Sequence, residues 1–456
     1  MMALSVLSAA VLTRHLGVVH FGQYTTVISL VAVVSTVTDA GMSVIGVREF
    51  SVRQDAERDE LMRDLLGLRM TLTAVGVLLV GGFALAAGYG TPLLVGAVLA
   101  SLGTIALVAQ HTHTIPISAE LRIGTLSGLE LARQVLTVGA IVGLVALGAG
   151  LLPLLAVVLA VNVLLIAPTA ALARHKISMR LAIRPRRWLA LLRLTVAFSL
   201  ASAVGTLYMF TTQIITSLVA SSHQSGLFAA SFRIFIVITV VPGTLVAGAL
   251  PLLARAARDD RERLAYAMQR IFDASLILGV GAAVGMLGGA QFVIEVVAGA
   301  KYAASAEVLQ IQGIALVATF VLAGWGYALL AMKRYKQVLL ANLVAFIVSC
   351  ASTLALASSH GAVGAALATV CGETVLAAGS LVVLVRGHRE MRPKLGIVLK
   401  VALAAAPAAV LALFPELPSL ARALLALLAY ALVIVLSGAV PEEAIELLPE
   451  RMRRAP

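Results

Sequence analysis

Charged residues are scarce in this chain, since Asp, Glu, Lys and Arg make up only 12% of its 456 residues. Such a composition excludes a soluble domain with an ordinary charged surface. Cysteine occurs twice, at Cys350 and Cys371, which excludes a disulfide-rich scaffold or a cysteine-ligated zinc centre. No glycine-rich loop ending in Gly-Lys-Ser/Thr is found, so the sequence does not indicate a pump driven by bound ATP.

Apolar residues dominate the chain, with a hydrophobic fraction of 61% and a mean hydropathy of +1.02. The apolar runs are long and continuous, a pattern that predicts membrane-spanning helices. We therefore predict an all-α polytopic membrane protein with about 14 transmembrane helices of ~20 residues each. The predicted crossings are 1–12, 23–47, 70–87, 92–110, 129–147, 151–173, 194–220, 227–254, 272–290, 308–332, 338–357, 362–385, 395–414 and 420–438.

Positive charges alternate between the two ends of these crossings. Nearly all of the 34 lysines and arginines lie in alternate loops or in the tail, the exceptions being Arg14, Arg133, Arg233, Lys301 and Arg422. Because positively charged loops stay in the cytoplasm, this bias predicts a multi-pass protein of the cytoplasmic (inner) membrane with both termini inside. The net charge of +12 is thus a topology signal, and we expect no nucleic-acid partner.

The first twelve crossings divide into two similar sets of six with the same orientation. This predicts two six-helix lobes related by pseudo-twofold symmetry, followed by two extra C-terminal helices. The predicted parts are an N-terminal lobe, a basic cytoplasmic linker, a C-terminal lobe, and the additional helices with a cytoplasmic tail, at 1–173, 174–193, 194–385 and 386–456. The loops predicted outside are short, which disfavours enzymes that need a sizeable outer domain.

Short motifs follow one another along nearly the whole chain: Thr13-Arg14-His15-Leu16-Gly17 with Phe21-Gly22-Gln23-Tyr24, Asp39-Ala40-Gly41 with Arg48-Glu49, Gly226-Leu227-Phe228-Ala229-Ala230-Ser231-Phe232-Arg233, Leu250-Pro251-Leu252-Leu253-Ala254, Ala298-Gly299-Ala300-Lys301-Tyr302 and Ser359-His360-Gly361-Ala362-Val363-Gly364-Ala365-Ala366. Their order resembles that of bacterial oligosaccharide flippases. That family belongs to the multidrug/oligosaccharidyl-lipid/polysaccharide exporter superfamily. One departure is that thirteen residues precede Arg14, which predicts either a start further upstream or a shortened first helix.

The resemblance implies a flippase for undecaprenyl-pyrophosphate-linked oligosaccharide repeat units, working by alternating access in surface polysaccharide biosynthesis. It implies no covalent chemistry, so the chain is not expected to be an enzyme, and no cofactor or metal. The implied partners are the lipid-linked oligosaccharide, membrane lipids, and a polysaccharide polymerase with its chain-length machinery. The alternatives are a drug or metabolite exporter of the same superfamily, a peptidoglycan lipid II flippase, a membrane glycosyltransferase or polymerase, and an inactive remnant.

Substrate-binding residues are expected among the polar side chains inside the predicted crossings. A charge at membrane depth is costly, so it faces a cavity or a partner, or it extends to the interface. Arg233 is the first candidate because a cation there can attract pyrophosphate or acidic sugars. Arg14 lies at the matching end of the first crossing. Gln213, on the helix before Arg233, can bond either sugar hydroxyls or a neighbouring helix.

Other polar residues within the crossings have both functional and structural interpretations. Glu373, near the middle of the twelfth crossing, can couple protons or form an ion pair. Asn162 can bind substrate or bond a neighbouring helix. For Asp39 we expect a contact at a helix end, and for Glu130 and Arg133, which are three residues apart, a local ion pair.

Two further patterns favour structural roles. Gly281, Gly285 and Gly289 form overlapping small-residue motifs, which predict that their helix packs closely on another. His111 and His113 do not share a helix face, so we expect no metal site there.

Overall fold

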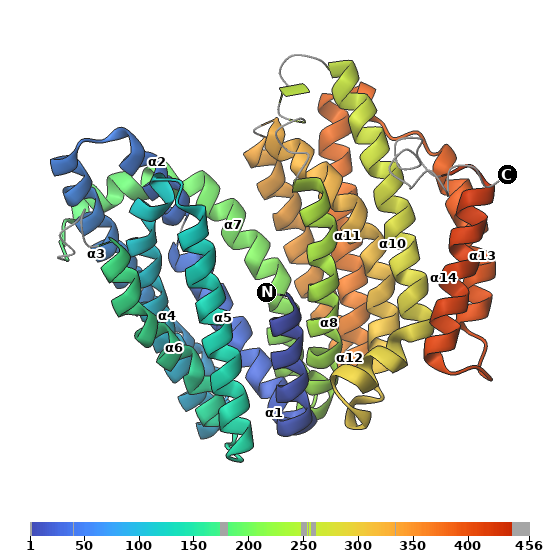
Figure 1. The fold of residues 1–456 in the computed structure, drawn as a ribbon, viewed down its shortest axis with the longest axis horizontal. Helices are drawn as coiled ribbons and strands as arrows, with labels where there is room; N and C mark the ends of the chain where they lie inside the picture. The colour runs from blue at the N-terminus through green and yellow to red at the C-terminus, as the bar shows by residue number, and fades with distance from the viewer. Residues whose placement is uncertain are drawn as a thin grey trace. The chain divides into compact units, whose positions relative to one another are not determined.

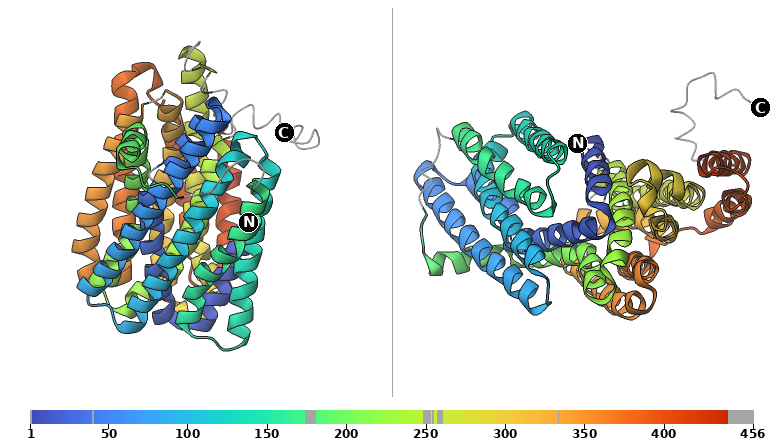
Figure 2. Two further views of the ribbon diagram at one scale, coloured as in Figure 1. Left: turned by 90° about the vertical axis from the view of Figure 1, so that its left-hand side faces the viewer. Right: turned by 90° about the horizontal axis from the view of Figure 1, so that it is seen from below.

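The structure, a computed structural model, describes residues 2–39, 41–173, 181–247, 253, 255–256, 261–332 and 334–439. All regular secondary structure in these residues is helical (Figure 1, Figure 2), which confirms the predicted all-α class. Some predicted features lie outside the described residues, namely 174–180 of the basic linker, most of the helix end at 250–254, and the tail beyond 439.

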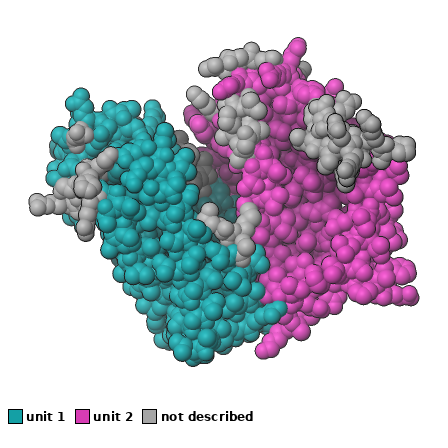
Figure 3. Space-filling model, in the orientation of Figure 1, with its two compact units in different colours: residues 1–229 teal, residues 230–456 magenta. Residues whose placement is uncertain are grey.

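The chain forms two compact units, unit 1 at Met1–Ala229 and unit 2 at Ala230–Pro456 (Figure 3). Unit 1 contains α1 (Met2–Asp39), α2 (Met42–Val52), α3 (Asp55–Ala86), α4 (Thr91–Ala119), α5 (Ile123–Ala146), α6 (Leu151–Ala173), α7 (Pro185–Val219) and the start of α8 (Ser222–Ala247). Unit 2 contains the rest of α8 with α10 (Arg261–Val297), η1 (Ala300–Tyr302), α11 (Ser305–Ala331), α12 (Tyr335–Gly387), η2 (Arg389–Met391), α13 (Gly396–Ala412) and α14 (Ser419–Leu436).

Ten helical stretches in the described part of the chain are long and apolar enough to cross a membrane. Two shorter apolar helices, Ala203–Val219 and Gly396–Ala412, accompany them. Many large apolar side chains are exposed on these helices, as expected where lipid rather than water surrounds them. The chain is therefore a multi-pass membrane protein.

Glycines with positive φ angles set the turns of unit 1. Gly88 (φ 69°) and Gly148 (φ 72°) follow the ends of α3 and α5, where a left-handed residue closes the helix. Gly17 (φ 69°, ψ 177°) interrupts α1 with non-helical backbone angles. Figure 1 shows α1 turning back at the lower end of the unit. A residue with a side chain would be strained at each position. These turns bring neighbouring helices alongside one another without long loops.

The bend of α1 packs closely against the turn between α7 and α8. A Cβ atom added at Gly226 would lie 2.0 Å from the Val18 carbonyl oxygen, and one added at Gly22 would lie 2.7 Å from the Gly226 Cα atom. Both clashes involve backbone atoms, which cannot move aside as a side-chain tip can. Glycine is therefore required at this contact within unit 1.

We expect Gly226→Ala to reduce the yield of folded protein sharply, because overpacking against fixed backbone costs about 1–3 kcal/mol or more. Size-exclusion profile and melting temperature in detergent measure the effect. Gly139→Ala in α5 is the matched control, since no atom lies within 4 Å of its added Cβ and alanine favours a helix. Equal behaviour of the two variants would contradict the close contact.

Unit 2 packs α10 against α11, α13 and α14. Gly281 of α10 faces the Tyr430 ring, with the added Cβ 3.2 Å from a ring carbon, and Gly289 faces Ala423. The predicted close packing of this glycine motif is thereby confirmed. Helices α13 and α14 lie side by side at one edge of unit 2 in both Figure 1 and Figure 2.

Candidate functional site

Arg233 lies on α8 as the one Asp, Glu, Lys or Arg residue between Ser222 and Ala247. Its side chain is half-buried, between the buried Phe232 and Ile234 in sequence. A guanidinium held in such an apolar helix is a strong attractor for phosphate oxygens that reach it.

Arg14 lies on α1, three residues before the bend at Gly17, and its side chain is exposed. It belongs to unit 1, whereas Arg233 belongs to unit 2. That the two cations serve one substrate stays a prediction.

Gln213 is fully buried on α7 and joins the polar residues near the bend of α1. Its Nε2 donates to Thr26 Oγ1 at 3.3 Å and to Ser225 Oγ at 3.1 Å, while its Oε1 is buried without a hydrogen-bond partner. The side chain thus links α7 to α1 and to the first turn of α8. A buried amide oxygen without a partner is costly unless a ligand or a water molecule supplies the donor.

Asn162 lies on α6 with 5% of its surface exposed, and its side chain contacts α4. Its Nδ2 donates to the Gly103 backbone carbonyl oxygen at 3.3 Å, and the backbone carbonyl oxygen of Asn162 accepts from Gln110 Nε2. These bonds join two closely packed helices, since a Cβ at Gly103 would lie 2.9 Å from the Leu159 nitrogen. Interhelical bonding is the observed contact of this residue, and substrate binding stays a prediction.

Glu373 lies on α12 in unit 2 and is 9% exposed. The Thr319 hydroxyl on α11 donates to its Oε2 at 2.7 Å. Glu130 and Arg133 form the predicted local ion pair on α5, at 2.5 Å. The observed contact of Glu373 is thus the bond to Thr319, and its role in proton coupling stays a prediction.

Sequence reasoning assigned Arg69 to a cytoplasmic loop, and the structure places it fully buried on α3. It forms an ion pair with Asp39 at the end of α1 and donates to Ser43 Oγ of α2 at 3.0 Å. Ser43 in turn donates to Asp39 at 2.6 Å. The expected helix-end contact of Asp39 is thereby confirmed. The one sequence signal for Arg69 was its position immediately before an apolar run.

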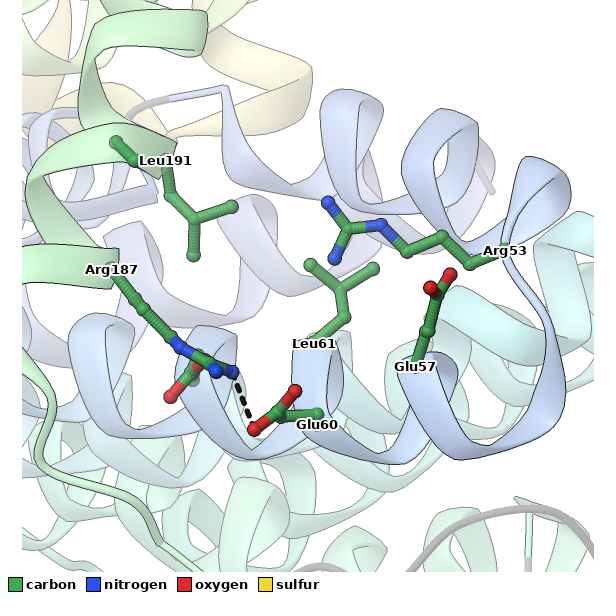
Figure 4. Close-up of a pocket in the computed structure, with 8 residues that line it drawn as sticks. Arg53, Glu57, Glu60, Leu61, Arg187 and Leu191 are labelled. Carbon is green, nitrogen blue, oxygen red and sulfur yellow. Dashed lines mark ion pairs between the residues drawn. The ribbon is translucent and has the colours of Figure 1, made fainter.

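A charged cavity of about 400 Å³ lies between the start of α3 and the start of α7 (Figure 4). Glu60 forms ion pairs with Arg184 and Arg187, and Arg187 also lies 3.6 Å from Asp64. The hydrogen bond to the Glu60 carboxylate raises the pKa of Arg187. Carboxylates and guanidinium groups balance one another in this cluster, so it fastens the two helices rather than offering an anion site.

Solved structures of membrane transporters are similar to this chain. A lipid II flippase, MurJ, in an inward closed conformation superposes with a TM-score of 0.81 over 96% of each chain at 12% identity. An inward-facing multidrug resistance MATE family transporter of the MOP superfamily superposes with a TM-score of 0.66 at 15% identity. The superposition covers 86% of this chain and 95% of the transporter. A MOP superfamily transporter from Pyrococcus furiosus superposes with a TM-score of 0.52 at 16% identity, over 86% of this chain and 95% of that transporter. The chain therefore shares its fold with these solved transporters.

A family model described as "polysaccharide biosynthesis protein" matches residues 11–307. The chain belongs to this family of polysaccharide biosynthesis proteins, and the resemblance of its motifs to flippases of that superfamily is confirmed. No curated protein matches the chain in sequence. Among the described residues, no group of three or more His, Cys, Asp or Glu side chains is arranged to hold a metal ion.

Proposed function

We propose that this protein is a flippase that moves undecaprenyl-pyrophosphate-linked oligosaccharide repeat units across the cytoplasmic membrane for surface polysaccharide biosynthesis. The family match supports a place in polysaccharide export. The observation that carries the substrate class is Arg233, a half-buried arginine and the one Asp, Glu, Lys or Arg residue of the apolar helix α8. A guanidinium pairs well with pyrophosphate and acidic sugars, and less well with cationic drugs.

The transmembrane arrangement that we propose has fourteen crossings with both termini in the cytoplasm. Two helical stretches, Leu4–Val52 with 49 residues and Tyr335–Gly387 with 53, are each more than twice the ~20 residues that one crossing needs. Each contains a glycine with non-helical backbone angles, Gly17 and Gly361, where one crossing would give way to the next. Alternating access would then act between an N-terminal and a C-terminal lobe.

The substrate pool of a deletion strain tests the proposal. If the protein is the flippase, undecaprenyl-linked repeat units accumulate inside the cell while the surface glycan disappears, and plasmid-borne protein reverses both changes. The accumulated sugar then identifies the substrate, and a polymerase acting outside would lie downstream of it. An unchanged glycan together with an unchanged precursor pool would refute the proposal.

Lipid II is the second candidate substrate, because the fold is similar to that of a lipid II flippase. The same experiment separates the two substrates. Accumulation of lipid II, with loss of cell-wall integrity and no change in another glycan, would favour the peptidoglycan role. Both lipids carry a pyrophosphate, so Arg233 is compatible with either.

A further inference from the structure

A second cavity, of about 360 Å³, lies within unit 1 where several turns meet. The bend of α1, the turn between α3 and α4, the start of α6 and the turn between α7 and α8 all contribute to it. These turns gather at the lower end of unit 1 in Figure 1, whereas α2 and the first turns of α3 lie at the other end. In the proposed topology the cavity therefore opens outside the cell.

Many of the described residues that line this outer cavity are polar, and none of them is Asp, Glu, Lys or Arg. The hydrogen-bonding groups of the cavity are hydroxyls and an amide, together with the His20 imidazole; the six that matter below are Gln23, Thr26, Tyr89, Ser217, Ser222 and Ser225. The volume lies in the range of small-molecule sites, about 300–1,000 Å³. Pro92, Leu93 and Leu151 add apolar surface to the lining. A cavity that combines hydroxyl and amide groups with apolar surface suits a neutral polyhydroxylated ligand such as a sugar ring.

Hydrogen bonds within the protein determine which oxygen atoms of the cavity can still accept a hydrogen bond from a ligand. Ser217 Oγ donates to the Ile214 carbonyl oxygen at 2.7 Å, so Tyr89 must be the donor in its 2.8 Å bond with Ser217. The Tyr89 oxygen is therefore left as an acceptor. Thr26 likewise donates its hydrogen to the Gly22 carbonyl oxygen at 2.9 Å.

Other groups of the cavity can still donate a hydrogen bond to a ligand. Ser225 Oγ accepts from Gln213 at 3.1 Å, which leaves its own hydrogen for a ligand. The Gln23 amide and the Ser222 hydroxyl make no hydrogen bond with any described residue. A site that offers both donors and acceptors matches sugar hydroxyls, because each of these both donates and accepts. The rings of Tyr89 and His20 add surface on which a sugar ring can stack.

The residues that line the cavity are held in place by contacts with the surrounding helices. Gln213 is fully buried and bonds both Thr26 and Ser225, while its Oε1 is left without a partner. The close contact of Gly22 with Gly226 fixes the two turns that carry these residues. A preformed site loses little free energy to ordering when the ligand binds.

We propose that this outer cavity binds a neutral sugar residue of the exported glycan, a role that rests on the proposed function. All the described residues that line this cavity belong to unit 1, and Arg233 is not among them. The cavity would hold the sugar after translocation and delay its return.

Cysteine protection tests the site in the full-length protein. In a Cys350→Ala/Cys371→Ala background, Ser222→Cys is labelled by a membrane-impermeant maleimide added outside. We expect methyl glycosides of glucose, galactose, rhamnose or N-acetylglucosamine to slow this labelling in a saturable way. His223→Cys is the matched control, because it is exposed on the same turn and does not line the cavity, so its labelling should not change. Absence of protection by every glycoside would overturn the proposal.

Removal of a single polar group should weaken the protection. We expect Gln23→Ala to raise the glycoside concentration for half-protection about five- to tenfold, the usual effect of one lost hydrogen bond. Gln291→Ala, a change at an exposed glutamine of unit 2, should leave it unchanged. An unchanged half-protection value in Gln23→Ala would overturn the assignment of this cavity.

The outcomes separate this proposal from the flippase proposal. Two results together would support the sugar site and refute the flippase proposal. These are saturable glycoside protection of the purified protein and a lipid-linked pool that does not change in the deletion strain. Accumulation of the precursor without glycoside protection would keep the flippase and reject the sugar site.

Discussion

Replacement of Arg233 by alanine is expected to abolish substrate flipping while the protein still accumulates in the membrane. The side chain is half-buried, and no other Asp, Glu, Lys or Arg occurs on α8. If Arg233 makes the proposed contact with pyrophosphate, its removal takes away a charge-assisted hydrogen bond, which is roughly twice as strong as a neutral one. In the complemented deletion strain, the measured results are loss of surface glycan and accumulation of lipid-linked repeat units, with immunoblots for protein level.

Two further variants sharpen this prediction. Arg233→Lys keeps the charge but loses the two-pronged geometry, so it should retain part of the activity. Arg386→Ala removes an exposed arginine near the end of α12 and should behave as wild type. Full activity of Arg233→Ala would exclude Arg233 from the substrate path. Loss of the protein itself would instead assign it a structural role.

Replacement of Arg69 by methionine is expected to destabilise the protein by about 1–3 kcal/mol, because it leaves the Asp39 carboxylate, which is 27% exposed, without its ion-pair partner. The Arg69 side chain is 0% exposed and Asp39 is its ion-pair partner from another helix. The measurement is the melting temperature of the purified protein in detergent, together with expression yield.

The double variant Arg69→Met/Asp39→Asn is the control for this prediction. It removes both charges at once, and methionine fills much of the arginine volume. We expect it to recover most of the lost melting temperature. A double variant as unstable as Arg69→Met alone would mean that Arg69 stabilises the fold through packing rather than through Asp39.

The helices were largely predictable from the sequence because apolar runs of membrane length are hard to produce in any other context. The start of α3 was not predictable from the sequence. Its helix begins at Asp55, whereas the apolar run begins near residue 70, because the first four turns are charged and pair with α7 through Glu60. Hydropathy predicts the membrane-spanning part of a helix but not a charged extension of the same helix beyond the membrane.

The polar contacts were less predictable, for a physical reason. The Glu130–Arg133 pair lies within one helix turn, and sequence spacing was enough to find it. Arg69 and Asp39 are thirty residues apart on different helices, so only their packing reveals the pair. The outer cavity is similar, since Gln23, Tyr89 and Ser225 come from three separate turns. In the sequence each is an ordinary polar residue beside an apolar run.

The single-residue reversal at Gly17 also determines where the chain can be modified. Where a helix turns back on itself at one glycine, the two helical halves are joined without a loop that could accept an epitope tag. Insertion at that position would separate the two halves of α1 and displace Val18, which already contacts Gly226. Tags for topology mapping are better placed after Leu147, which is 84% exposed, where the turn between α5 and α6 has several residues.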